Sequence, residues 1–270
     1  MSRVARSLLF VPGDRPERFD KAVASGAHEV VLDLEDAVAP AAKAAARGMV
    51  ALWLSTGREA FVRINALHTE WYADDLRMLR AVPSACVMLP KADADSLVRT
   101  AQALPGRRII ALLETVSGCM ELAQMARVPG LERIAFGSVD FAAESGIADE
   151  GDAMTGVRVQ IVLHSCHAGL LAPIDGVSVH FDDDARMRAD ALRSRQLGFG
   201  GKLCIHPRQV AQVNAAFLPS PQDMQWAQAV MAAFEASGGA ATSVDGKMID
   251  KPVVDRARRI VAESRSNGAA

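Results

Sequence analysis

Residues 108–115 read Arg-Ile-Ile-Ala-Leu-Leu-Glu-Thr, an apolar run that ends on a carboxylate. Strands that are buried on both faces, as in a parallel sheet covered by helices, have this continuous apolar character. The polar pair at the end marks the point where the chain leaves the core. The stretch therefore predicts a strand of a parallel sheet, with Glu114 at its carboxyl end.

Seven other short β-branched or apolar runs repeat this arrangement. Successive runs start 22 to 41 residues apart, which accommodates a strand, a helix of about 10–15 residues and two loops. Eight such units predict an α/β fold, a (β/α)₈ or TIM barrel. A doubly wound open sheet is the second choice, because no G-x-G-x-x-G motif follows the first run. The expected strands are 7–11, 29–34, 59–64, 85–89, 108–113, 133–136, 174–179 and 202–205.

The end of the chain differs from the rest in composition. Asp93 and the Ser220-Pro221 pair are typical residues for starting helices, and Gly238-Gly239 would end the second of these helices. Small residues follow over 238–243, and a helical apolar pattern returns over 252–264. We therefore expect a catalytic barrel domain over 1–237 and a short helical lid or arm over 238–270.

Composition excludes several classes of protein. Half of the 270 residues are hydrophobic, the net charge is −2 and aromatic residues make up 5%. Nucleic-acid binders usually have a basic stripe, and a membrane span needs about 20 consecutive apolar residues. The four cysteines have neither zinc-site nor redox spacing, and no secretory signal precedes the first strand. We expect a cytoplasmic protein with reduced cysteines and with neither a nucleic-acid nor a membrane partner.

Polar side chains gather where the expected strands end, which is where barrel enzymes carry their chemistry. Seven of the eight ends have a charged or titratable group, a coincidence that a purely structural barrel does not need. His206 could equally be a structural residue that donates a hydrogen bond to a neighbouring carbonyl. The groups are Arg15, the Asp33/Glu35/Asp36 cluster, Arg63, Lys91, Glu114, Asp140 and His206.

Glu114 and Asp140 follow two strands that are neighbours in a barrel. Adjacent strands lie about 4.8 Å apart, so the two carboxylates can share one divalent ion. Oxygen ligands without cysteine or histidine favour Mg²⁺ or Mn²⁺ over zinc. The alternative is that each carboxylate is a structural ion-pair partner, for instance of Lys91 or Arg63.

Arg63 ends an apolar strand and can bind a carboxylate or a developing oxyanion with two parallel hydrogen bonds. The alternative is an ion pair with Glu114 or Asp36. Side chains alternate along a strand, so only some acids of the 33–36 cluster can face the barrel mouth. Glu35 and Asp36 are the candidates for holding water molecules on a bound metal.

Several short motifs together resemble the citrate lyase β-subunit-like branch of the HpcH/HpaI aldolase superfamily. They occur in the family's order and cover about residues 3–262; each is weak alone, and their order is specific. Residues 137–140 depart from the pattern, with Ser-Val where relatives often have Ala-Glu. The motifs are RSLLFVPGDRP at 6–16, LDLEDAV at 32–38, VRIN at 62–65, MLPK at 88–91, LET at 113–115, FGSVDF at 136–141 and GKLCIHP at 201–207.

The resemblance implies a Mg²⁺-dependent carbon–carbon lyase, with Mn²⁺ also possible. It would cleave a 3-hydroxyacyl-CoA thioester, such as citryl-, malyl- or citramalyl-CoA, into acetyl-CoA and a 2-oxo acid, or form the thioester from these two compounds. By motif, Glu114 and Asp140 match the metal ligands and Arg63 matches the active-site arginine. The positions that match CoA contacts in relatives are Phe10, Arg15 and Lys21.

Asp250 matches a C-terminal acid that acts in a neighbouring subunit's site in this family, so the resemblance implies a homo-oligomer, either a trimer or a hexamer. Its neighbours Met248 and Ile249 are apolar. The alternative is that the arm packs on its own barrel and that Asp250 only caps the helix that follows it.

Other activities stay open at this stage. A thioesterase on the same acyl-CoA substrates would release free CoA, and a free-acid class II aldolase would need no CoA. A non-catalytic CoA- or metal-binding subunit is a fourth reading, against which the presence of the charged motif residues argues. The sequence names neither the acyl group nor an acyl-carrier partner.

Overall fold

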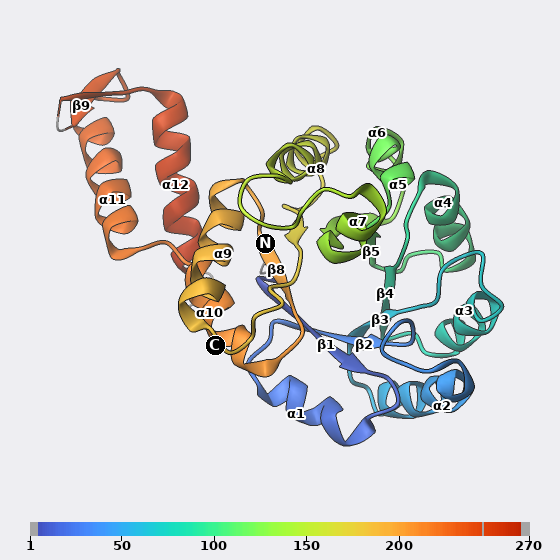
Figure 1. Ribbon diagram of the computed structural model, residues 1–270. Helices are drawn as coiled ribbons and strands as arrows, with labels where there is room; N and C mark the ends of the chain where they lie inside the picture. Colours follow the sequence, from blue (N-terminus) through green and yellow to red (C-terminus); the bar gives the residue numbers. More distant parts are fainter. Residues whose placement is uncertain (1–4, 245, 266–270) are drawn as a thin grey trace. The chain divides into compact units, whose positions relative to one another are not determined.

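Eight parallel strands close into a barrel in the computed structural model, which describes residues 5–244 and 246–265. The strands follow one another in chain order around the barrel, and the last pairs with the first (Figure 1). The predicted (β/α)₈ barrel is therefore confirmed, and the open doubly wound sheet is wrong. The strands are β1 (Ser7–Pro12), β2 (Glu29–Asp33), β3 (Ala60–Arg63), β4 (Ala85–Leu89), β5 (Ile109–Leu113), β6 (Leu131–Phe136), β7 (Ile174–Asp175) and β8 (Gly201–Cys204).

Seven of these strands match their predicted ranges closely, whereas β7 is shorter than the predicted 174–179. It ends at Asp175, and the next residue, Gly176, lies close to the end of β6, where a Cβ atom would collide with Ser138 Oγ. Only glycine permits this close approach.

Helices alternate with the strands and surround the barrel (Figure 1). Asp93 caps its helix as predicted: its Oδ1 accepts from the backbone N–H of Ser96 at 2.7 Å, and the Ser96 hydroxyl accepts from the Asp93 N–H at 3.0 Å. The helical elements up to residue 216 are η1 (Pro16–Arg18), α1 (Phe19–Ala24), η2 (Pro40–Ala42), α2 (Lys43–Leu54), α3 (Tyr72–Ala81), α4 (Ala94–Ala103), α5 (Val116–Met120), α6 (Leu122–Met125), α7 (Ser138–Ser145), α8 (Thr155–His167), α9 (Asp184–Gln196) and α10 (Pro207–Ala216).

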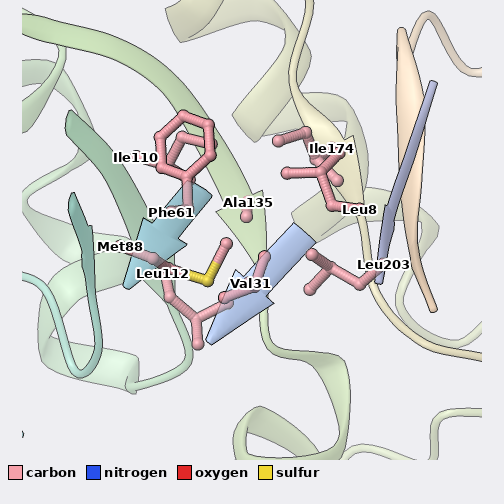
Figure 2. Packing of buried hydrophobic residues seen from close by; sticks show 9 residues of the cluster. All are labelled: Leu8, Val31, Phe61, Met88, Ile110, Leu112, Ala135, Ile174 and Leu203. Carbon is pink, nitrogen blue, oxygen red and sulfur yellow. The ribbon is translucent and has the colours of Figure 1, made fainter. Parts of the chain in front are cut away.

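The interior of the barrel is filled by side chains from every strand. Figure 2 shows this cluster, whose members are all at most 3% exposed. Inward-pointing branched residues pack in layers in this way in (β/α)₈ barrels, so the barrel is a solid core and not a channel. The cluster consists of Leu8, Val31, Phe61, Met88, Ile110, Leu112, Ala135, Ile174 and Leu203.

The chain divides into two compact units, one running to Asn214 and the other beginning at Ala215. The second unit contains α11 (Pro221–Ala236), the β9 (Thr242–Val244) and β10 (Lys247–Ile249) hairpin, and α12 (Lys251–Arg265). It has its own apolar cluster, made by Ala227, Val230, Ile249, Val254, Ala257 and Ile260. The boundary expected after residue 237 lies inside this unit, because α11 and α12 pack together and the Gly238-Gly239 pair makes the turn that follows α11.

Two expectations from composition can be compared with the structure. The four cysteines are free thiols, without a disulfide. None of the helices in the described part of the chain combines the length and the apolar character that crossing a membrane requires.

Candidate active site

A cavity of about 490 Å³ lies among residues that end or follow the strands. Small-molecule sites typically have volumes of about 300–1,000 Å³. Charged lining residues come from the ends of β2, β3 and β5 and from the start of α7, and apolar ones come mainly from β1 and from the segments around β7 and β8. The lining consists of Phe10, Pro12, Asp33, Asp36, Ala37, Arg63, Leu112, Glu114, Phe136, Gly137, Ser138, Val139, Asp140, Val177, Val179, Leu203 and Ile205.

The alternation of side chains along each strand explains which residues face this cavity. Successive side chains point to opposite faces, so the residue two positions beyond a barrel-core residue also points inward. The cavity floor is therefore the last layer of the barrel core. Six strands have a core residue followed by a lining residue at this spacing: Leu8 and Phe10, Val31 and Asp33, Phe61 and Arg63, Leu112 and Glu114, Ala135 and Gly137, and Leu203 and Ile205.

Arg63 is held by Asp33 on the neighbouring strand. The two residues are register partners of β2 and β3, and the guanidinium forms two parallel hydrogen bonds to the carboxylate, at 2.8 Å from Nε and 2.5 Å from Nη2. The guanidinium also lies 4.9 Å from the centre of the Phe10 ring. Burial would lower the pKa of Arg63, but its hydrogen bonds to Asp33 and the nearby acids raise that pKa above its usual value. Arg63 is therefore a fixed cation.

Glu35 connects this arginine to Lys91. Its Oε2 lies 3.0 Å from Arg63 Nη1, and its Oε1 accepts from Lys91 Nζ at 2.5 Å. Burial raises the pKa of Glu35, and the charge of Arg63 opposes that shift. Asp36, which is more exposed, lies 3.4 Å from the same Nη1 atom. Of the alternatives left open for Arg63, the pair with Asp36 is therefore present.

Glu114 is almost fully buried and only half satisfied. The residue is 1% exposed, and its Oε1 accepts from the backbone N–H of Lys91 at 2.7 Å. No described residue hydrogen-bonds to its buried Oε2. Burial and the negative charge of Glu35 raise the pKa of Glu114 to about 8, and Asp140 adds to that shift. A buried carboxyl with an open oxygen, close to other acids, suits a cation as its partner.

Gly137 and α7 complete this side of the cavity. A Cβ atom at Gly137 would lie 2.8 Å from Glu114 Oε2, so only glycine leaves that oxygen room. Asp140 lies in the first turn of α7 and not at the strand end itself. The hydroxyl of Ser138 is buried without a hydrogen-bond partner among the described residues.

Glu114 and Asp140 therefore fit a hard divalent cation. Mg²⁺ in proteins is usually bound by one or two carboxylates and completes its coordination with water or substrate oxygens. Within residues 5–244 and 246–265, no three His, Cys, Asp or Glu side chains form a complete metal site. The residues present suit an ion that is shared between the protein and small oxygen ligands.

Six residues named from the sequence do not line this cavity, and two of them, Glu35 and Lys91, bind residues that do. The other four lie elsewhere. Arg15 and Lys21 are exposed and lie beyond the end of β1, at η1 and in α1. The His206 ring stacks on Phe181, with ring centres 5.0 Å apart. Asp250 belongs to the second unit, where its Oδ1 accepts from the Val253 N–H at 3.3 Å at the start of α12.

The apolar half of the cavity was not predicted from the sequence. Val177, Val179, Leu203 and Ile205 line it, and Val179 and Ile205 are 54% and 44% exposed. Ile205 lies two residues beyond the core residue Leu203, so the alternation of side chains along a strand would have predicted that it faces the cavity. The valines lie after the early end of β7, in a segment that the sequence predicted to be strand.

The chain is similar to known proteins in both sequence and structure. The HpcH/HpaI aldolase/citrate lyase family model matches residues 6–207. A (3S)-malyl-CoA thioesterase of Cereibacter sphaeroides is 32% identical, over 98% of this chain and 96% of its own. An L-malyl-CoA/β-methylmalyl-CoA lyase of Rhodobacter capsulatus is 33% identical, over 97% and 95%.

Among solved structures, CitE of Mycobacterium tuberculosis in complex with magnesium, acetoacetate and coenzyme A matches with a TM-score of 0.86. It is 34% identical and the match covers 97% of this chain and 98% of that one. All residues that line the cavity fall within the segment that the family model matches. Sequence motifs, barrel topology and near full-length similarity agree: the chain belongs to the HpcH/HpaI aldolase/citrate lyase family.

Proposed function

We propose that this protein is a Mg²⁺-dependent lyase that cleaves, or forms, the carbon–carbon bond of a 3-hydroxyacyl-CoA thioester. The observation that carries the proposal is the open oxygen of buried Glu114, in one cavity with Asp140 and Arg63. The M. tuberculosis relative binds magnesium, acetoacetate and coenzyme A, which supports the same ligand classes here. Glu114 and Asp140 would hold the metal, and Glu35 and Asp36 would hold water near it.

The reaction moves negative charge onto the thioester. The substrate hydroxyl loses its proton to water and becomes a carbonyl, the bond between this carbon and the thioester α-carbon breaks, and the electron pair of that bond forms the acyl-CoA enolate. Protonation of the enolate at its α-carbon then gives acetyl-CoA, and the other product is a 2-oxo acid. Mg²⁺, when bound, supplies positive charge for the substrate oxygens.

Arg63 would stabilise the developing oxyanion. Nε and Nη2 each donate to Asp33, and Nη1 faces both Glu35 and Asp36, so at most one of the five N–H groups, the second on Nη2, is left for a substrate. Asp33 holds the guanidinium in place, so little reorganisation is needed when charge develops.

The CoA part of the substrate would bind at Phe10, Arg15 and Lys21. Phe10 lines the cavity, whereas Arg15 and Lys21 present exposed cations in the segment after β1. Cations suit the phosphates of CoA.

We also propose that residues 238–270 act as a lid or arm that brings Asp250 to the site of a neighbouring subunit, where it protonates the enolate. Asp250 would then need an oligomer. Its hydrogen bond to the Val253 N–H supports the alternative, a purely capping role. Mixing inactive Asp250→Asn and Glu114→Ala proteins separates the two: activity returns on subunit exchange if the site is shared, and no return despite proven exchange refutes sharing.

A thioesterase is the second candidate, because a (3S)-malyl-CoA thioesterase is 32% identical over 98% of this chain. It would hydrolyse the thioester and leave the carbon skeleton intact. Product masses distinguish the two reactions, since a lyase gives acetyl-CoA and a 2-oxo acid whereas a thioesterase gives free CoA and a hydroxy acid.

The decisive experiment is a panel of malyl-, citramalyl- and citryl-CoA, each assayed with Mg²⁺ and with EDTA. Metal-dependent acetyl-CoA release supports the lyase. Turnover of the free hydroxy acids would indicate a free-acid aldolase instead, and full activity in EDTA would contradict the metal site.

A further inference from the structure

Lys91 has an unusual backbone conformation beside the candidate metal site. Its φ angle is +47°, and it is the one non-glycine residue with a positive φ in the described part of the chain. Residues that have a side chain rarely adopt this left-handed region, and such strain concentrates at functional sites. The conformation therefore calls for a compensating interaction.

Two interactions depend on this conformation. The backbone N–H of Lys91 donates to Glu114 Oε1 at 2.7 Å, and the ammonium of the same residue donates to Glu35 Oε1 at 2.5 Å. Lys91 therefore binds two buried carboxylates, Glu114 through its main chain and Glu35 through its side chain. The left-handed turn is what allows the amide and the side chain of a single residue to reach both acids.

The ammonium continues into a connected set of charges. Glu35, which accepts from Lys91, also pairs with Arg63 at 3.0 Å, and Arg63 is bound to Asp33. The network thus runs without a break from β2 through β3 and β4 to the carboxylate that follows β5. Among the described residues, Lys91 connects Glu35 to Glu114, because its side chain binds the first carboxylate and its main chain binds the second.

We propose that Lys91 is a positioning residue that fixes Glu114 with its amide, so that Oε2 stays available for the metal, and fixes Glu35 and Arg63 with its ammonium. The inference rests on the proposed function for what Glu114 and Arg63 do. Lys91 is absent from the residues that line the cavity, and both of its interactions are with these neighbours.

The alternative to a positioning role is that Lys91 only forms an ion pair at the protein surface. The side chain is 45% exposed, but the Glu35 side chain it pairs with is only 7% exposed. Burial opposes the protonated form of Lys91, yet the hydrogen bond and charge of Glu35 raise the pKa of the ammonium. The pair therefore compensates a buried carboxylate, which exposed pairs do not.

The two roles can be separated with a matched pair of variants, Lys91→Gly and Lys91→Val. Both remove the ammonium. Glycine adopts positive φ readily and keeps the amide in place, whereas β-branched valine disfavours that conformation and turns the amide away from Glu114. Lys91→Ala, which tolerates the conformation better than valine, is the second variant should valine prevent folding.

Mn²⁺ binding without substrate, measured by electron paramagnetic resonance, reports on the amide. Losing a hydrogen bond to a charged group should weaken Mn²⁺ binding by Lys91→Val about 10-fold or more relative to Lys91→Gly. Equal affinities for the two variants would overturn the role of the amide. If valine does not fold, the same comparison is made between alanine and glycine, with the difference in the same direction.

Turnover and chemical rescue report on the ammonium. Lys91→Gly should lose about 10- to 100-fold in kcat, as is typical when partners that orient active-site groups are removed, with little change in KM. Ethylammonium chloride should restore part of this kcat, whereas tetramethylammonium, which cannot donate a hydrogen bond, should not. Unchanged kcat, or a loss that ethylammonium does not restore, would overturn this role.

Arg99→Ala serves as the control, because it removes an exposed ion pair within α4, 2.8 Å long, whose partner is Asp95 and neither of the two acids. It should change neither Mn²⁺ affinity nor kcat. If the wild-type protein turns over none of the acyl-CoA substrates, the proposed function fails, while the Mn²⁺ comparison between glycine and valine still decides the role of the amide.

Discussion

Two buried carboxylates at the ends of barrel strands, Glu114 and Asp175, differ in almost every interaction. Asp175 is 0% exposed, and its Oδ1 accepts from Arg158 Nε at 2.9 Å and from the Gly176 N–H at 2.8 Å. Its Oδ2 accepts from the Ser194 hydroxyl and lies 3.9 Å from Lys202 Nζ. Glu114 is 1% exposed, but it has one backbone partner and an open oxygen.

The pKa values of the two groups move in opposite directions. Burial raises the pKa of both, but the charges of Lys202 and Arg158 reverse this for Asp175, and its pKa is lowered. Glu114 has mainly acids around it, and its pKa rises to about 8. Burial alone therefore does not identify a functional acid. The contrast shows that a saturated carboxylate stabilises the barrel, while an unsaturated one is available to a ligand.

Replacing Glu114 with glutamine should give the largest effect. With one metal-holding oxygen converted to an amide, kcat should fall by about 10³-fold, because a bound metal contributes several kcal/mol of charge stabilisation. Near pH 5, where folded Glu114 keeps its proton, the metal-free variant should be as stable as the wild type. Saturating Mg²⁺ should raise the unfolding free energy of the wild type, by about 2.7 kcal/mol at 100 times Kd. An equal Mg²⁺ effect on the variant would contradict the comparison.

Replacing Asp175 with asparagine should act on stability. Arg158 and Lys202 would stay buried with their main counter-charge removed, and breaking such a pair typically costs about 3–5 kcal/mol. Urea unfolding measures the loss, and the folded variant should still bind Mg²⁺. Asp95→Asn is the matched control, since Asp95 forms an exposed pair with Arg99 and should change stability by less than about 1 kcal/mol.

Replacing Arg63 with lysine tests the cavity that contains Glu114, with a smaller expected effect than Glu114→Gln. Lysine keeps the charge but not the planar fork that binds Asp33 with two hydrogen bonds. The expected loss is about 10²- to 10³-fold in kcat, the size seen when one oxyanion donor is removed. Steady-state kinetics separates the possibilities, because a rise in KM alone would show that Arg63 binds the ground state and not the transition state.

The pH dependence of stability should differ in sign between the two acids, with the smallest effect expected within any one pH unit. Without metal, folded Glu114 keeps its proton between its ordinary pKa of 4.5 and about 8, whereas the unfolded chain has lost it. Stability should therefore fall as pH rises through this window. Asp175 contributes stability above its ordinary pKa of 3.8 that is lost as pH falls further.

Urea unfolding in EDTA at a series of pH values checks this prediction. The difference in stability between wild type and Glu114→Gln should decline from about pH 5 to pH 8 by at most 1.4 kcal/mol per pH unit, the limit for one proton. A difference that does not vary with pH would mean that folded Glu114 titrates like an exposed acid.

Much of the fold was predictable because its signal is local. The apolar runs have the length of strands, and the Asp93 and Ser220 caps begin helices where the sequence places them. The early end of β7 was not predicted, because the end of a strand depends on its pairing with neighbouring strands, here β6 and β8, and not on its own apolar residues alone. The packing of α11 with α12 likewise joins segments that the hairpin separates, which a local pattern does not report.

The sequence by itself determined the eight strand–helix units and the side of the barrel where acids and bases gather, since both follow from periodicity and from the end at which a parallel strand leaves its core. It did not determine which acid is saturated. Arg158, Ser194 and Lys202 converge on Asp175 from α8, α9 and β8, and only folding brings them there. Likewise, only the left-handed turn at Lys91 joins Glu114 to the arginine network. Pairing between distant residues depends on three-dimensional closeness, which residue order alone does not specify.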